Sequence, residues 1–143
     1  MLVMLAALLA VAPLAARAAQ TARERPAVCT VVAIGSDQAK HRRNSFRATR
    51  ILDLEFETLV SADVGLERSL QLRLYTPQGF LYQVLETRLD PSRGGKRRRV
   101  QARLPVAGTS IMASGLYGRW RAIPHLDDGR EPCGQARSFV IKP

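Results

Sequence analysis

The sequence has few of the residues from which metal and cofactor sites are usually built. Its 143 residues include two cysteines, Cys29 and Cys133, and two histidines, His41 and His125. A zinc site needs three or four ligands, and only the acidic turn Asp127–Asp128 stands near His125 in the sequence. A calcium site would need more oxygen ligands in a defined loop than this turn supplies. We therefore expect no metal ion and no cofactor.

Motifs for nucleophilic catalysis are also missing. The sequence has no Gly-x-Ser-x-Gly elbow, and neither cysteine has a histidine close by in the sequence that would activate its thiol. The carboxylates Asp53, Glu55 and Glu57 alternate along one predicted strand, where they more simply keep an exposed face soluble. We therefore predict that the protein is not an enzyme.

The one long apolar stretch stands at the N-terminus. Leu2 to Leu14 is too short to cross a bilayer as a helix, and Ala16-Arg17-Ala18 has the small-x-small pattern that a signal peptidase accepts. No lysine or arginine follows Met1, which departs from the usual signal pattern. We predict a signal peptide over residues 1–18, a polar leader over 19–27 and a single domain over 28–143, exported to the periplasm or the medium without a transmembrane segment.

Two cysteines in an exported chain are best interpreted as a pair. An oxidising compartment favours a Cys29–Cys133 disulfide, which would close a loop of 103 intervening residues. Loop entropy then suggests a stabilisation of about 4–5 kcal/mol at most. The alternatives are two buried free thiols or a metal pair that lacks its other ligands.

Period-2 alternation of apolar and polar residues is the clearest structural signal. It predicts strands over residues 51–60 and 69–76, each with one face in the core and one in water. A helix would place Leu70 and Leu72 about 200° apart, so the helical interpretation fails. The residues predicted to point inward are Leu52, Leu54, Phe56, Thr58, Val60, Leu70, Leu72 and Leu74, and those predicted to point outward are Asp53, Glu55, Glu57, Gln71, Arg73 and Tyr75.

Further strands are predicted over residues 28–34, 80–89, 100–104, 116–126 and 137–141. Thr76-Pro77-Gln78-Gly79 has the pattern of a type I turn, so residues 69–89 form a hairpin. About seven strands without an amphipathic helix indicate an all-β fold, a two-sheet antiparallel β-sandwich. For Trp120 we favour a role in core packing. The alternative is an exposed aromatic face that Trp120 would share with Tyr75, Tyr82 and Tyr117.

The last third of the chain carries a recognisable combination of motifs. The segments 115–121 (GLYGRWR), 126–129 (LDDG) and 137–141 (RSFVI) resemble the last hairpin of immunoglobulin-like domains. In that family, a Gly-x-Tyr such as Gly115-Leu116-Tyr117 often marks a tyrosine corner. The chain also resembles small secreted bacterial proteins of unknown function that carry such a domain. The resemblance implies an immunoglobulin-like sandwich and brings no catalytic residues with it.

The chain is strongly basic. Its net charge is +10, or +9 once Arg17 leaves with the signal peptide, and it has 19 arginines against 3 lysines, a skew typical of GC-rich genomes. Basic residues gather in segments 40–50 and 93–103, the second including a predicted loop over residues 93–99. Candidate polyanion-binding residues in these segments are Arg42, Arg43, Arg93, Lys96, Arg97, Arg98 and Arg99.

Two interpretations of these basic segments stay open. They could neutralise the phosphates of lipopolysaccharide, another anionic polymer or nucleic acid. They could also be ordinary solvated loops, which we favour because no aromatic residue interleaves the arginines of residues 93–99. The two segments would make one patch only if both lay at the same end of the sandwich.

Taken together, these patterns predict a non-catalytic exported module that acts by surface binding or in envelope assembly. The expected partner is an unidentified protein or cell-envelope polymer. The alternative is a polyanion-binding protein that uses the two basic segments. The oligomeric state is left open by the sequence.

Overall fold

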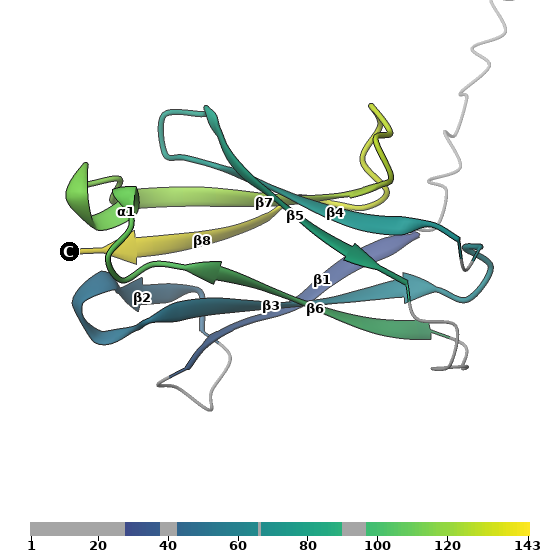
Figure 1. The fold of residues 1–143 in the computed structure, drawn as a ribbon, viewed down its shortest axis with the longest axis horizontal. Coiled ribbons are helices and arrows are strands. Elements are labelled where there is room, and N and C mark those ends of the chain that lie inside the picture. The colour runs from purple at the N-terminus through teal and green to yellow at the C-terminus, as the bar shows by residue number, and fades with distance from the viewer. Residues whose placement is uncertain (1–27, 38–42, 66, 90–96) are drawn as a thin grey trace, which may run out of the picture.

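The computed structural model describes residues 28–37, 43–65, 67–89 and 97–143. These residues form two β-sheets that face each other across a common core (Figure 1). The predicted signal peptide (1–18) and polar leader (19–27) lie outside the described residues, as do Arg42, Arg93 and Lys96. The described part of the chain contains no helix long and apolar enough to cross a membrane.

One sheet has three antiparallel strands in the order β1-β3-β6, and the other has five in the order β2-β8-β7-β4-β5. The all-β, two-sheet prediction is confirmed, with eight strands among the described residues rather than about seven. The short strand β2 was not predicted, and it pairs with β8 in parallel. The bounds are β1 Cys29–Ser36, β2 Ser45–Arg47, β3 Asp53–Ser61, β4 Ser69–Tyr75, β5 Leu81–Arg88, β6 Arg97–Pro105, β7 Gly118–Leu126 and β8 Arg137–Lys142, with a 3-10 turn η1 Ala48–Arg50 and a one-turn helix α1 Ser110–Ala113.

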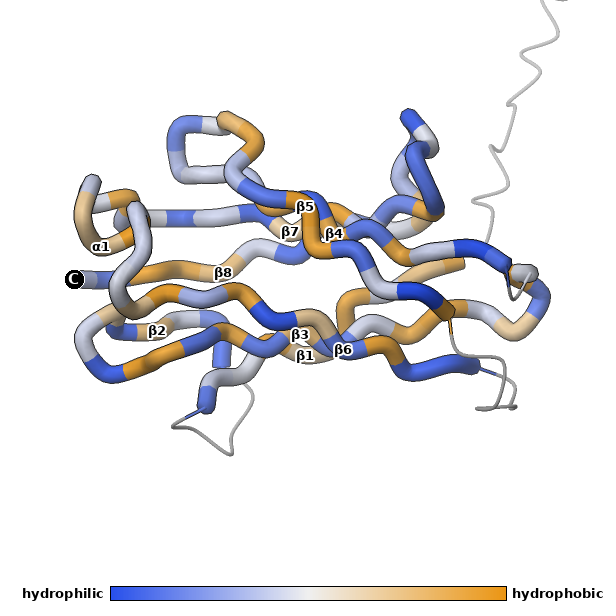
Figure 2. The backbone as a smooth tube through the Cα atoms, viewed as in Figure 1, coloured by the Kyte–Doolittle hydropathy of each residue, from blue (hydrophilic) through white to orange (hydrophobic). Residues whose placement is uncertain are grey.

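The core lies between the sheets and follows the predicted alternation. Figure 2 shows apolar and polar stretches alternating along the strands. Trp120 on β7 is fully buried: its ring packs edge-on against Tyr82 at 5.2 Å and lies roughly parallel to that of Phe139 at 6.1 Å. Its indole N–H donates to the Leu116 carbonyl over 2.9 Å. The core role of Trp120 is therefore confirmed. The inward residues that prove buried are Leu54, Phe56, Thr58, Val60, Leu70, Leu72 and Leu74.

The predicted exposure is wrong at two positions. Leu52 is 59% exposed, because β3 begins only at Asp53 and the Asp37 carboxylate accepts hydrogen bonds from the backbone N–H groups of both Leu52 and Asp53. Gln71 is buried although it points outward, because the loop between β7 and β8 covers it. Alternation predicts the face of a sheet on which a side chain lies, but it does not predict which parts of that face another segment covers.

The tyrosine corner implied by the resemblance is not formed. The Tyr117 hydroxyl has no hydrogen bond to any described residue, and the turn before β7 is instead held by Trp120 through the Leu116 carbonyl. Tyr117 packs at the edge of the core.

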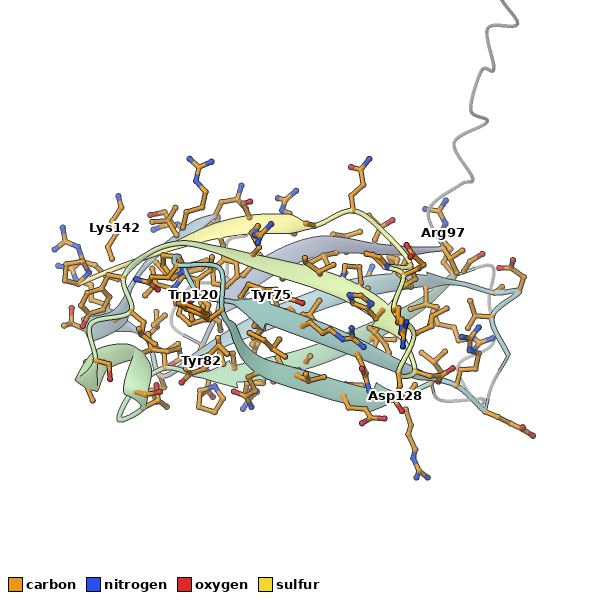
Figure 3. The ribbon with its side chains drawn as sticks, turned by 90° about the horizontal axis from the view of Figure 1, so that it is seen from above. Tyr75, Tyr82, Arg97, Trp120, Asp128 and Lys142 are labelled. Atoms are coloured by element: carbon orange, nitrogen blue, oxygen red, sulfur yellow. A yellow bond between two sulfur atoms is a disulfide. The ribbon has the colours of Figure 1, made fainter. Side chains whose placement is uncertain are left out.

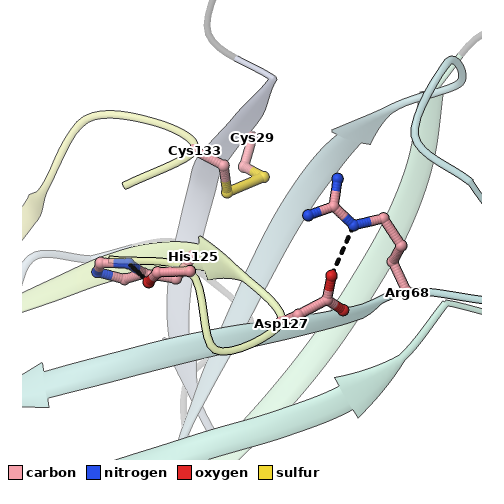
Figure 4. The surroundings of a disulfide bond; sticks show 6 residues. Cys29, Arg68, His125, Asp127 and Cys133 are labelled. Carbon is pink, nitrogen blue, oxygen red and sulfur yellow. Dashed lines mark hydrogen bonds and ion pairs between the residues drawn. A yellow bond between two sulfur atoms is a disulfide. The ribbon is translucent and has the colours of Figure 1, made fainter. Parts of the chain in front are cut away.

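The Cys29–Cys133 disulfide is confirmed, with the two Cα atoms 5.2 Å apart (Figure 4). It ties the start of β1 to the loop between β7 and β8, beside a second, smaller core cluster. The Cys29 N–H donates to the Cys133 carbonyl over 2.8 Å. The next residue, Gly134, has no room for a side chain, since a Cβ atom there would overlap the Cys29 carbonyl oxygen. Glycine at position 134 therefore allows the two backbones to approach.

The predicted hairpin of residues 69–89 is also confirmed. The Gly79 N–H donates to the Thr76 carbonyl over 2.9 Å, and Gly79 has a φ of 88°, a conformation that glycine adopts without strain. The Thr76 N–H in turn donates to the Phe80 carbonyl. This turn brings β5 back beside β4 as the outermost strand of the five-stranded sheet.

Candidate functional site

The outer face of the five-stranded sheet carries a group of exposed and half-buried apolar, aromatic and cationic side chains. In one row across three strands, Tyr75 of β4 lies between Leu81 of β5 and Arg121 of β7. The Arg121 guanidinium carbon lies 5.7 Å from the centre of the Tyr75 ring, a cation–π distance. The next row has a similar composition. We call these residues the outer patch: Arg73, Tyr75, Leu81, Val84, Arg121 and Ile123.

Exposed hydrophobic residues concentrate at one margin of this patch. Phe80, Leu81 and Val84 are 72%, 52% and 39% exposed, and all three belong to the hairpin that ends in β5. In Figure 2 this hairpin projects from the sandwich, and the side of its tip that leads into β5 is coloured apolar. Burying such side chains against a partner would remove apolar surface from water. Among the described strands β5 pairs with β4 alone, so its other edge has no strand partner in the part of the chain that the structure describes.

The rest of this face is covered by the loop that follows β7. Asp128 accepts a hydrogen bond from the Gln71 side-chain amide over 2.9 Å. The Gly129 carbonyl accepts from Arg73 over 3.2 Å and lies 3.0 Å from Nδ1 of His125. His125 is therefore buried beneath this loop. The loop marks where the outer patch ends.

Asp127 fixes the start of this loop. Its backbone has a positive φ of 50°, and its carboxylate accepts from the Ser69 N–H over 2.8 Å and from Nε of Arg68 over 2.7 Å (Figure 4). The Ser69 N–H, with the Arg68 guanidinium, holds the pKa of Asp127 below its usual value. Both contacts join the loop to the beginning of β4. Within the described residues, no group of three or more histidine, cysteine or acidic side chains is placed to hold a metal ion.

Of the aromatic residues weighed for an exposed binding face, only Tyr75 belongs to the outer patch. Tyr82 packs against the buried Trp120, and its hydroxyl lies 2.8 Å from Oγ of Ser110. The signal for the patch was present in the sequence: Phe80 and Leu81 directly follow the turn and are adjacent, so they cannot both face inward.

The outward carboxylates of β3 face arginines of β6. Glu57 lies 3.1 Å from Nε of Arg99, and Arg103 contacts Glu55 at 2.9 Å and Asp53 at 3.5 Å. The register places Glu55 directly opposite Arg103. Two arginines of the basic segment 93–103 are therefore partly neutralised by acidic neighbours on the adjacent strand.

The prediction that residues 93–99 form a loop is wrong for Arg97, Arg98 and Arg99, which are the first three residues of β6. Arg98 is only 7% exposed, and its guanidinium donates to the carbonyls of Val64 over 2.6 Å and Ala62 over 3.2 Å. The aliphatic part of an arginine side chain can occupy an apolar site while its head reaches backbone carbonyls. Arg98 has the same parity as Val100 and Leu104, so the alternation already placed it on the inner face.

Arg97, Arg98 and Arg99 lie far from the first basic segment. Ser36, which precedes the first segment, pairs with Leu54 near the start of β3, while Arg97 in the second pairs with Ser61 at its end. At about 3.3 Å per residue, these positions lie about 23 Å apart. Figure 3 shows Lys142 and Arg97 at opposite ends of the sandwich. Arg97, Arg98 and Arg99 therefore do not share a surface with the described arginines of the first segment, whereas Arg103, opposite Glu55, lies nearer to that segment.

No protein-family model matches the chain, and comparison with curated proteins finds no significant match.

Proposed function

We propose that this protein is an exported, non-catalytic module with an immunoglobulin-like fold, which binds a partner protein through the outer patch. This proposal rests on one observation: Tyr75 and Arg121 lie close to three exposed hydrophobic residues of the β5 hairpin. These residues lie beside the edge of β5 that has no strand partner among the described residues. Tyrosine and arginine are enriched at the energetic centres of protein interfaces, and clustered exposed apolar side chains mark interaction sites.

The strand order supports the immunoglobulin-like part of the proposal. With β1 as strand A and β2 as its continuation on the other sheet, the two sheets have the orders A-B-E and G-F-C-C′. Immunoglobulin-like sandwiches also place strands C, F and G in one sheet and A, B and E in the other. In this assignment β5 is strand C′, and the outer patch lies on the C′-C-F part of the sheet.

Export is supported by the disulfide together with the N-terminal sequence. A disulfide between Cys29 and Cys133 persists in an oxidising compartment such as the periplasm or the medium. The apolar run and small-x-small pattern of residues 1–18 are consistent with the same destination.

Polyanion binding remains the second candidate, and the structure favours only the first basic segment for it. In the second segment, Arg98 is buried and Arg99 and Arg103 lie against carboxylates. In the first segment, the described arginines Arg43, Arg47 and Arg50 have no ion pair with another described residue.

Affinity capture with matched variants tests the proposed function. The mature chain, immobilised at a surface lysine, is exposed to a cell-envelope extract and washed with 0.5 M NaCl, which screens ionic contacts to a few ångströms. We expect the wild-type chain to retain a partner protein that the double variant Leu81→Ser and Val84→Ser does not retain. Leu52→Ser is the control, since Leu52 is equally exposed and lies outside the outer patch.

Retention of the same proteins by all three chains would contradict the proposal. So would binding that disappears entirely at 0.5 M salt, because that result favours ionic contacts with a polyanion. Circular dichroism of each chain establishes that the variants are folded.

A further inference from the structure

A basic pocket opens at the end of the sandwich where β1 and β8 finish, at the β2 edge of the five-stranded sheet. Its volume is about 310 Å³. The buried side chains of Phe46 and Ile51 form its apolar part. Its polar lining comes from segments far apart in the sequence: Ser36, Arg43, Ser45, Arg47, Arg50 and Lys142.

The pairing of β2 with β8 brings like charges together. Arg47 lies directly opposite Lys142 in the parallel register, and Arg50 follows in the 3-10 turn. Like charges placed opposite each other on adjacent strands destabilise a sheet. None of the pocket cations has an ion pair with a described residue. Folding alone therefore does not account for this concentration of positive charge.

Ser36 supplies a second, independent observation. It lines the pocket and is only 7% exposed, yet its hydroxyl has no hydrogen-bond partner. A buried hydroxyl without a partner costs free energy, and most buried polar atoms in proteins are paired. Because Ser36 lines the pocket, a small shift of its enclosed side chain would let the hydroxyl donate to a bound group. The next residue, Asp37, has its carboxylate engaged by the backbone N–H groups of Leu52 and Asp53.

We propose that the basic pocket binds the phosphate monoester group of a small molecule or headgroup. A phosphate monoester carries close to two negative charges at neutral pH and offers three strong acceptor oxygens. Guanidinium groups bind such oxygens with two parallel hydrogen bonds, and the hydroxyls of Ser36 and Ser45 can complete the set. The volume also leaves room for the sugar or glycerol unit that carries the phosphate.

This site does not depend on the proposed function. The outer patch is centred on β4 and β5, and the pocket is built on β2 at the opposite edge of the same sheet. The chain would then have a protein-binding face and a separate phosphate site.

Titration with inorganic phosphate at constant ionic strength tests the pocket. We expect the wild-type mature chain to bind phosphate, and the double variant Arg47→Gln and Arg50→Gln to bind it about tenfold to a hundredfold more weakly. Arg130→Gln, which removes an exposed arginine from the loop after β7, should bind as wild type. Ser36→Ala should also weaken binding without lowering Tm, because it removes an unpartnered buried hydroxyl.

The proposal is overturned if phosphate raises Tm equally in all these chains, since phosphate stabilises proteins in general by exclusion from their surface. Vesicles distinguish the two sources of the phosphate. Binding to phosphatidic acid but not to phosphatidylcholine vesicles, reversed by free phosphate, assigns a lipid headgroup. Phosphate binding without vesicle binding assigns a soluble phosphate ester. The Leu81→Ser and Val84→Ser variant should keep its phosphate binding, so failure of one proposal leaves the other intact.

Discussion

The Arg98 guanidinium donates a 2.6 Å hydrogen bond to the Val64 carbonyl from a position that is almost fully buried. Arg98 therefore has a structural role at this end of the sandwich, although it lies in the most basic part of the sequence. Its neighbours Arg97 and Arg99 are exposed on the other face of β6.

Arg98→Ser should destabilise the fold by about 1–3 kcal/mol, because it leaves the buried Val64 carbonyl without its donor. Arg97→Ser should change stability by less than about 0.5 kcal/mol. Urea unfolding of the two variants measures both effects. Equal, small changes would mean that Arg98 is solvated like its neighbour.

Removing the disulfide should destabilise the domain by up to about 4–5 kcal/mol, because the bond closes a loop of about a hundred residues in the unfolded chain. The double variant Cys29→Ala and Cys133→Ala, compared with wild type in urea, measures this loss. Thiol labelling of denatured, non-reduced wild type should find no free thiol. Two reactive thiols in protein from an oxidising compartment would be inconsistent with the pairing.

Leu72→Ala or Phe56→Ala should cost about 2–5 kcal/mol, since both side chains are fully buried between the sheets. Glu55→Ala should cost less than about 1 kcal/mol, because its ion pair with Arg103 is exposed. The reverse order in an unfolding experiment would require the register of these strands to shift by one residue.

Gly134→Ala should be strongly destabilising, because its Cβ would overlap the Cys29 carbonyl oxygen beside the disulfide. Gly35→Ala is the matched control, since nothing lies within 4 Å of a Cβ there. The difference between the Tm values of the two variants measures how much stability is lost when a Cβ is added at the close contact between the two backbones. A Gly134→Ala protein as stable as the Gly35→Ala protein would show that the two backbones can separate without cost.

The contacts of Asp127 predict a pH-dependent contribution to stability. Because hydrogen bonds from Ser69 and Arg68 lower its folded pKa, ionised Asp127 stabilises the fold above its ordinary pKa of 3.8, and this contribution is lost as pH falls through the lower folded value. Asp127→Asn tolerates the positive φ but lacks the charge. Wild type should therefore be more stable than the variant at pH 7, and the gap should shrink below about pH 4. A constant gap between urea midpoints at pH 7 and pH 3 would exclude this linkage.

Local patterns were enough to predict most strands, the hairpin of residues 69–89, the core positions of Leu54, Phe56 and Leu72, and the pairing of the two cysteines. These features follow from period-2 alternation, turn chemistry and cysteine count, which are local or compositional properties of the chain. The pairing partners of the strands could not be predicted in the same way. The parallel contact of β2 with β8 joins segments about 95 residues apart, and no local pattern specifies it.

Period-2 alternation is enough to specify an all-β chain with one buried face on each main strand, because it directly reflects which side chains avoid water. Which polar residues are covered, and which basic residues meet, depends instead on how the two sheets and their loops pack. Packing buried Gln71 and His125, gave Arg98 its carbonyl partners, placed Arg97 at the opposite end of the sandwich from the first basic segment, and assembled the basic pocket from β1, β2 and β8. The physical reason is that such coverage depends on contacts between residues distant in sequence. These contacts form only once the intervening chain is ordered and both sheets are in place, so no local pattern reports them.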